Sequence, residues 1–136
     1  MSLAYRFFLA GILFAIAGMS LGTYMGSTHD FTFAPVHAHI NLVGWTTFFL
    51  FGLYYRGDEI SAGSMLGEAH FVCALLGGVF LPVGIVGAVT GNASLDLAII
   101  PGTLLTLASM VLFLAVVARA WSRQRSDTRT RFAKAI

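Results

Sequence analysis

The segment His37-Ala38-His39 contains the residues of this chain whose type and spacing are best suited to chemistry, because neutral imidazole is the commonest metal ligand in proteins. Pro35 fits the first position of a helix, so we expect both histidines in the first turns of a helix that begins there. Residues two apart on a helix differ by about 200° in direction, so the two rings should point to nearly opposite faces. We therefore expect each histidine to serve a different partner.

The residues that follow the pair extend these faces. Asn41 and Gly44 lie on the predicted His37 face of the helix. Heme iron, copper and zinc all accept imidazole ligands, and histidines can also hydrogen-bond across a helix interface without binding anything. Three roles thus stay open from the residues alone, namely a heme site, a copper or zinc site, and a structural or assembly role.

Heme would need further ligands. A six-coordinate heme has two axial ligands on opposite sides of the iron. The second ligand for each iron must therefore come from another copy of the chain or from a group such as Met19 or Met25. His29 lies on the same side of the membrane in a loop, where it is expected to be solvated. We favour ligation between subunits.

His70 is predicted to lie at a different level from the pair. Its helix enters from the opposite surface, which places it level with about Leu50 and close to 20 Å from the pair at 1.5 Å per residue. We expect a hydrogen-bonded residue near that surface and not a ligand.

The composition indicates a membrane protein. Of the 136 residues, 57% are hydrophobic and 10% are charged, compared with about 45–50% and about 25% in a soluble domain. Four apolar segments, each long enough for the about 20 residues of a membrane span, lie at roughly residues 3–26, 35–55, 66–90 and 95–121. We expect an all-α membrane protein with one four-helix transmembrane domain over residues 1–122 and a basic cytoplasmic tail at residues 123–136.

The charges predict the orientation. All eight Lys and Arg residues fall on one side of the membrane if the chain starts in the cytoplasm: Arg6, Arg56, Arg119, Arg123, Arg125, Arg129, Arg131 and Lys134. By the positive-inside rule both termini are cytoplasmic, in a multi-pass protein of the cell membrane, with a bacterial inner membrane favoured. These residues are expected to meet lipid headgroups of the bilayer and not nucleic acid. The segment ending at Ala15-Ile16-Ala17 has features of a signal peptide, but the apolar run continues, so we expect it to remain as the first span.

Small and aromatic residues predict how the helices pack. Gly18, Gly22 and Gly26 recur at every fourth residue of the first segment, which favours close approach of two helix backbones. Phe48, Phe49 and Phe51 are expected to face lipid. A proton or ion transporter is the least favoured function, because no Asp or Glu lies at mid-membrane depth.

Two segments resemble a known family. Residues 36–56, VHAHINLVGWTTFFLFGLYYR, resemble the tenth transmembrane helix of the catalytic subunit of heme–copper oxidases, particularly the C-family enzymes and nitric oxide reductases. In that helix a His-x-His pair is followed by Gly-Trp and by a Tyr-Tyr ending. Residues 66–87, LGEAHFVCALLGGVFLPVGIVG, are similar to the next helix of the family. The other two segments share only hydropathy with it.

The resemblance implies a heme site built on the motif. It implies that His37 ligates a high-spin heme b and His39 a low-spin one, with Asn41, Gly44 and Trp45 beside them. One copy of the chain has no counterpart of the three copper-binding histidines or of the active-site tyrosine of the family. We therefore do not expect the chain to reduce oxygen on its own.

The resemblance also implies an oligomer. The twelve helices of the family form three similar four-helix arcs about a pseudo-threefold axis. A four-helix chain that resembles the last arc could form a homotrimer, with heme shared between His37 of one copy and His39 of the next. The expected function is that of a small membrane cytochrome that transfers electrons to or from a redox partner or binds a diatomic gas. The alternatives are a copper or zinc site of the same histidines and a structural or assembly protein.

Overall fold

A computed structural model describes the backbone of residues 1–134 and the side chains of residues 1–126, and this part of the chain is helical with no β-strand. The elements are α1 (Leu3–Thr28), α2 (Ala34–His39), the π-helix η1 (Ile40–Thr46), α3 (Thr47–Gly57), α4 (Glu59–Ala62), α5 (Met65–Thr90), α6 (Ala93–Asp96) and α7 (Ile99–Lys134). The segments α2, η1 and α3 follow one another without a break, while α4 and α6 are single turns in the connections. The prediction of an all-α protein is confirmed.

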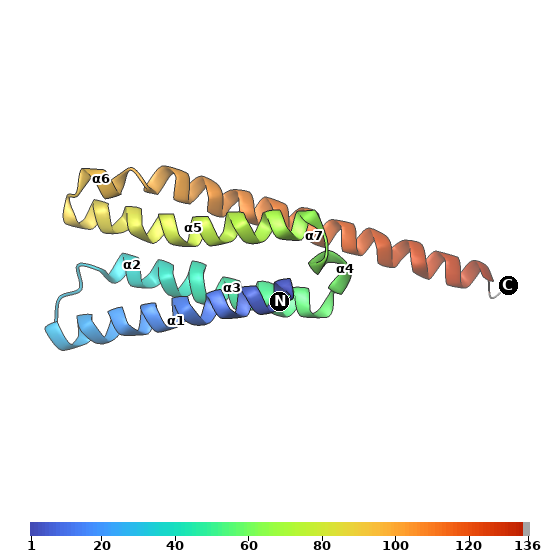
Figure 1. Ribbon diagram of the computed structural model, residues 1–136, viewed down its shortest axis with the longest axis horizontal. Helices are drawn as coiled ribbons and strands as arrows, with labels where there is room; N and C mark the ends of the chain where they lie inside the picture. Colours follow the sequence, from blue (N-terminus) through green and yellow to red (C-terminus); the bar gives the residue numbers. More distant parts are fainter. Residues whose placement is uncertain (135–136) are drawn as a thin grey trace.

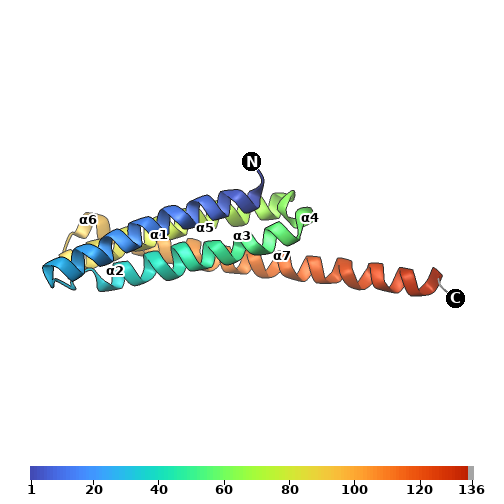
Figure 2. The same cartoon turned by 90° about the horizontal axis from the view of Figure 1, so that it is seen from below.

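Four rods lie side by side and alternate in direction, with α7 running far past the others (Figures 1 and 2). We call the end that holds Arg6, Arg56 and Arg119 the arginine end. The opposite end, which holds the connections 29–33 and 91–98, is called the histidine end. The predicted tail at residues 123–136 begins inside α7, which is helical up to Lys134, so residue 122 marks no break in the backbone. Residues 135–136 lie outside the described residues.

Three helices are long and apolar enough to cross a membrane: Leu3–Thr28, Met65–Thr90 and Ala93–Ser126. The remaining predicted segment, residues 35–55, is helical throughout. However, the π-helix divides it into pieces of 6, 7 and 11 residues, each too short to span by itself. Membrane character is therefore supported by three long apolar helices.

The π-helix is a departure from the regular helix expected after Pro35. It has a wider turn than an α-helix because its hydrogen bonds join residues five apart. The hydroxyl of Thr47 donates to the carbonyl of Leu42, five residues earlier, at 2.7 Å. Gly44, in the same segment, lies against the ring of Phe14, with no room for a Cβ. Such turns occur frequently at functional sites, and this one begins directly after His39.

The core is aromatic and lies toward the arginine end. Phe7 is 0% exposed, and its ring meets those of Phe48, Phe51, Tyr55, His70 and Phe71 at centroid distances from 4.8 to 5.5 Å. These rings come from α1, α3 and α5, so one ring of α1 joins three helices.

The expectation that three phenylalanines face lipid is wrong for two of them. Phe49 is 41% exposed, whereas Phe48 and Phe51 are 1% and 3% exposed and belong to the aromatic core. Lipid tails and a protein core are equally apolar. Composition therefore gave no sign of which face of this helix turns inward.

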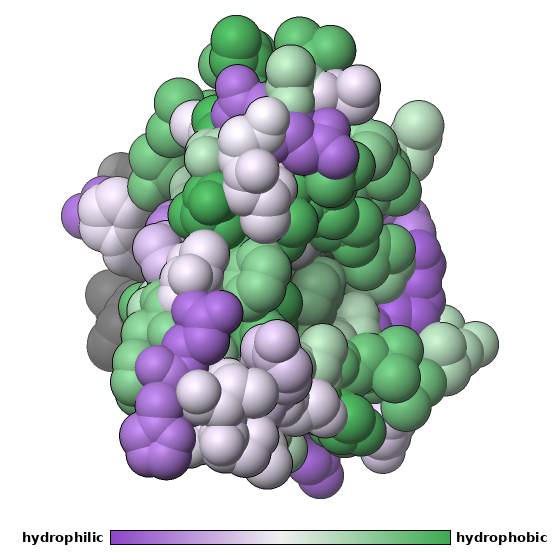
Figure 3. All heavy atoms as spheres, turned by 90° about the vertical axis from the view of Figure 1, so that its left-hand side faces the viewer, coloured by the Kyte–Doolittle hydropathy of each residue, from purple (hydrophilic) through white to green (hydrophobic). Residues whose placement is uncertain are grey.

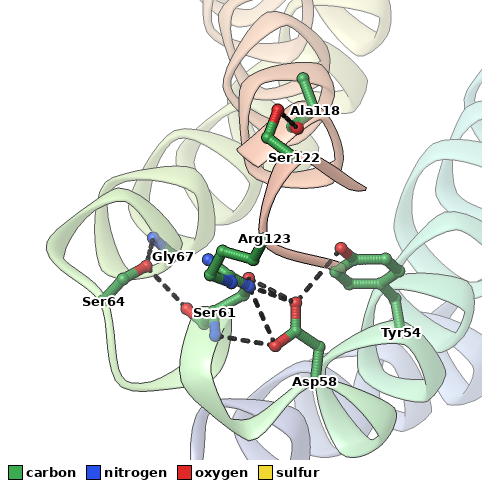
Figure 4. A network of polar contacts seen from close by, with 8 residues as sticks. All are labelled: Tyr54, Asp58, Ser61, Ser64, Gly67, Ala118, Ser122 and Arg123. Atoms are coloured by element: carbon green, nitrogen blue, oxygen red, sulfur yellow. Dashed lines mark hydrogen bonds and ion pairs between the residues drawn. The ribbon is translucent and has the colours of Figure 1, made fainter. Parts of the chain in front are cut away.

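A polar network closes the arginine end (Figure 4). Asp58 accepts from the backbone N–H of Ser61 at 3.1 Å and from its hydroxyl at 2.5 Å. The guanidinium of Arg123 in α7 donates to both carboxylate oxygens of Asp58 at 3.2 and 3.0 Å, and to the hydroxyl of Ser61 at 2.9 Å. A second ion pair, Arg6 to Glu68 at 2.6 Å, joins α1 to α5. The contacts of Arg123 thus join the connection before α5 to α7, and the Arg6–Glu68 pair joins α1 to α5.

We expect Asp58→Ala to lower the free energy of unfolding by about 1–2 kcal/mol, because it removes the N-cap of α4 and the partner of Arg123. Thermal or denaturant unfolding in detergent measures the change. The matched control is Glu59→Ala, which removes the exposed carboxylate next along the chain and should change stability by less than about 0.5 kcal/mol. Equal stability of the two variants would contradict the role of the network.

The network also predicts a pH dependence. Burial raises the pKa of Asp58. The hydrogen bonds from Ser61 and the charge of Arg123 together lower it by more than burial raises it, so the pKa lies below its ordinary value of 3.8. A carboxyl group with a lowered folded pKa stabilises the fold above that ordinary value, and its contribution is lost as pH falls through the folded pKa. We expect stability to fall below about pH 4 more steeply in the unaltered protein than in Asp58→Ala, as measured by unfolding at stepped pH.

Candidate functional site

The ring of His37 lies between α2 and α1 and is half-buried. Its Nδ1 is 2.9 Å from the carbonyl oxygen of Gly18 in α1. The side-chain amide of Asn41 lies against the same ring, 3.3 Å from Nδ1 and 3.5 Å from Nε2, and donates to the carbonyl of His37 at 2.8 Å. The predicted grouping of Asn41 with His37 on one face is therefore observed.

Two glycines of α1 make room for these side chains. A Cβ on Gly22 would lie 2.8 Å from Cε1 of His37, and a Cβ on Gly18 would lie 2.6 Å from the amide of Asn41. Both distances are too short for non-bonded carbon contacts. Gly26, the third member of the stripe, has nothing within 4 Å of its Cβ position. The sequence indicated close packing along this stripe but not that Gly18 and Gly22 enclose the polar side chains of the candidate site.

The ring of His39 points away from this interface. Its Nδ1 is 2.8 Å from the carbonyl oxygen of Pro35, four residues earlier in the same helix. Nε2 makes no hydrogen bond to any residue within the described part of the chain. The prediction that the two histidines serve different faces agrees with this geometry, since His37 meets α1 while His39 binds only its own helix.

The two hydrogen bonds fix the protonation of both rings. A carbonyl oxygen can only accept, so Nδ1 of His37 and Nδ1 of His39 must carry the hydrogen. In the neutral ring, Nε2 then holds a lone pair. Metal-ligating histidines commonly have this arrangement, with one ring N–H given to a backbone carbonyl and the other nitrogen left to bind the metal.

The other predicted site residues lie apart from His37. Trp45 is 45% exposed and, with Thr46, Phe49 and Leu50, lines an apolar hollow of about 230 Å³ on the outer face of the helix. Gly44 lies on the inner face against Phe14. The motif therefore divides into an inner group at α1 and an outer group around Trp45.

The alternative ligands named from the sequence differ in access. Met25 is buried at 5% exposure, whereas Met19 is 60% exposed. His29 caps the C-terminal end of α1 with φ 57° and is exposed. Within the residues that the structure describes, no group of three or more His, Cys, Asp or Glu side chains could hold a metal ion.

The two connections of the histidine end, residues 29–33 and 91–98, each contain one aspartate and no Lys or Arg. Asp30 accepts from the backbone N–H of Thr32 at 2.9 Å and from its hydroxyl at 2.6 Å, and these bonds lower the pKa of its carboxyl group. Asp96 lies in the other connection. Viewed from this end, hydrophilic and hydrophobic residues lie next to one another (Figure 3).

His70 is far from the pair. The hydroxyl of Tyr55 lies 2.9 Å from its Nδ1, so the predicted hydrogen bond is present. The ring is 0% exposed, in the aromatic core and not at a surface. It contacts Phe51, which is 14 positions after His37, or about 21 Å along a helix at 1.5 Å per residue.

Comparison with known proteins gives no relative for this fold and site: no family model, no curated protein and no solved structure matches the chain.

We expect ¹⁵N spectra of histidine-labelled protein to show hydrogen on Nδ1 of His37 and of His39, because both nitrogens donate to carbonyls. Gly22→Ala should displace the His37 ring, change its signals and lower stability by about 1–3 kcal/mol by overpacking, while leaving the His39 signals unchanged. Gly26→Ala is the matched control, because its Cβ meets nothing. If both glycine variants alter His37 equally, the proposed fit between Gly22 and His37 is wrong.

Proposed function

We propose that this chain is a four-span membrane protein that binds b-type heme through His37 and His39, with each histidine serving a different iron and with heme held between copies of the chain. The observation that supports the proposal is that both rings donate Nδ1–H to a backbone carbonyl, which makes Nε2 the candidate ligand atom of each, with the amide of Asn41 3.5 Å from that of His37. The resemblance of the motif to heme–copper oxidases favours heme as the group that they bind.

The proposed topology follows from length and charge. The unbroken helical stretch from residue 34 to residue 57 has 24 residues, more than the about 20 needed to cross a bilayer. It is counted here as the second of four spans. The arginine end faces the cytoplasm by the positive-inside rule. Trp121 is 59% exposed, and the guanidinium of Arg125 lies 4.8 Å from the centre of its ring. An exposed tryptophan beside an arginine is typical of a helix position at the membrane surface.

Sharing between subunits follows from the direction of His39. The contact of its ring is with its own helix, at Pro35, and not with α1, so the chain itself offers no second histidine beside it. A cyclic homo-oligomer supplies one at every interface. We favour a trimer because of the three-arc arrangement of the family that the motif resembles.

The residues of the chain have distinct proposed tasks. Gly18 fixes the His37 ring through its carbonyl, and Gly22 leaves the space in which that ring lies. On the outer face, the hollow at Trp45 offers an apolar surface beside the His39 side of the helix. Bound heme would supply one-electron redox chemistry or, with one axial position open, binding of a diatomic gas.

A copper or zinc site is the second candidate. The same Nε2 atoms are suitable ligands for these ions, and several copies meeting at a symmetry axis could supply the required number. Elemental analysis of the purified protein separates this alternative, since it would give stoichiometric copper or zinc and no porphyrin. A third possibility, a structural or assembly role, leaves the protein without either group.

We expect protein purified from membranes to show a Soret band. His37→Ala and His39→Ala should each reduce heme per chain by at least half, and the double variant should bind none, because no other described histidine lies beside them. Absorption with pyridine hemochrome quantification measures this, and the mass in detergent tests the trimer. Spectra of the reduced protein with and without carbon monoxide separate an open axial position from a filled one.

His29→Ala is the matched control, because this exposed loop histidine is at the same end of the bundle and has no proposed role. It should retain the full heme content. Absence of a Soret band from the unaltered protein, or a band that survives the double variant, would exclude heme ligation by the pair.

A further inference from the structure

His70 is buried in a cage of aromatic rings. Its ring lies 5.2 Å from that of Phe7 and 5.2 Å from that of Phe113, at interplanar angles of 34° and 27°. Phe51 meets it edge-on at 4.4 Å and 80°. A phenyl ring of similar size would satisfy such apolar surroundings without carrying polar atoms. Hydrophobic packing alone therefore does not account for an imidazole at this position.

The two ring nitrogens of His70 are in different situations. Nδ1 is 2.9 Å from the hydroxyl of Tyr55. Nε2 is buried and has no hydrogen-bond partner among the described residues. Buried polar atoms are rarely left unpaired because this costs stability, and an ionisable side chain inside a membrane helix is a candidate functional site.

Tyr55 links His70 to a hollow at the arginine end that has charged residues in its lining. This hollow has a volume of about 590 Å³, and Tyr55, Arg56, Glu59 and Glu68 are among its lining residues. Its charged lining and size suit a water-filled space. Tyr55 therefore borders the hollow and also contacts the buried imidazole through its hydroxyl.

We propose that Tyr55 and His70 form a proton-exchange site that opens to the hollow. A hydrated proton adds to the hydroxyl oxygen of Tyr55 as Tyr55 passes its own hydroxyl hydrogen to Nδ1 of His70, whose other hydrogen is on Nε2. Two O–H bonds break, one in the hydrated proton and one in Tyr55, while one new O–H bond forms on Tyr55 and one N–H bond forms on His70. The hydrated proton is left as water, and the single positive charge moves onto the imidazolium. The reverse sequence releases the proton to the hollow.

The surroundings of the ring are compatible with a transient cation. The rings of Phe7 and Phe113 are each 5.2 Å from it at small interplanar angles, and aromatic faces attract cations. Tyr55 is the titratable contact on α3. The nearest charges along α1 and α5 are Arg6 and Glu68, which pair with each other at 2.6 Å and so offset one another. The proposal does not depend on heme binding.

The test uses full-length protein in lipid bilayers with ¹⁵N-labelled histidine, studied by solid-state NMR between about pH 4 and about pH 9. His70→Gln assigns the signals. We expect both His70 nitrogens to shift together as the ring gains a proton, and the ring hydrogen to exchange with water. Tyr55→Phe should slow this exchange at least tenfold, because it removes the connecting hydroxyl.

Tyr54→Phe is the matched control, since Tyr54 precedes Tyr55 on the same helix but its hydroxyl contacts Asp58 and not His70. It should leave the exchange rate within twofold of the unaltered protein. A His70 ring that stays in one neutral tautomer over the whole range, or equal exchange in Tyr55→Phe, overturns the proposal. Folding of Tyr55→Phe is judged by elution and by the His29 signals. If this variant does not fold, the unaltered protein alone tests the proposal, and a His70 ring hydrogen that does not exchange with heavy water over hours overturns the proposal.

Discussion

A histidine ring inside an apolar helix bundle needs a hydrogen-bond partner. That partner determines which ring nitrogen carries hydrogen and which one holds the lone pair. His37 and His39 both use a backbone carbonyl, which can only accept, so the lone pair of each neutral ring is on Nε2, and in His37 the amide of Asn41 lies 3.5 Å from that atom. His70 uses a tyrosine hydroxyl, which can donate or accept, so its protonation is not fixed in the same way. The chemistry available to each histidine therefore depends on its hydrogen-bond partner and not only on its depth in the bundle.

Close approach of α1 to α2 makes the His37 contact possible. Gly18 has two tasks in this contact, because its carbonyl accepts from the ring while its missing side chain leaves room for Asn41. In lipid, packing and not water exclusion holds helices together, so the glycines that permit packing also determine which backbone carbonyls a neighbouring side chain can reach. The stripe of small residues and the histidine pair thus form one structural unit.

The sequence predicted the helices and the opposed directions of the pair, because helical periodicity is local. It did not predict the inward position of Phe48 and Phe51 or the full burial of His70, since these depend on which neighbour covers each face. The π-helix after His39 was also missed, because INLVGWT has no Pro and only one Gly to mark a change of turn. Gly18 and Gly22 were found as a stripe, but their contact with His37 requires the register between two helices, which no spacing within one helix contains.

The two ends of the bundle differ in the residues that pack between the helices. At the arginine end, rings from α1, α3, α5 and α7 fill the interior, and Phe7, Tyr55 and His70 are at most 1% exposed. Nothing as large as a porphyrin could enter that core without displacing several rings. At the histidine end the interior contacts are made by glycines, and the free nitrogen of His39 and the hollow at Trp45 lie on the outside. Packing therefore differs along the bundle: bulky rings fill the space between the helices at one end, and glycines let the helices approach closely at the other.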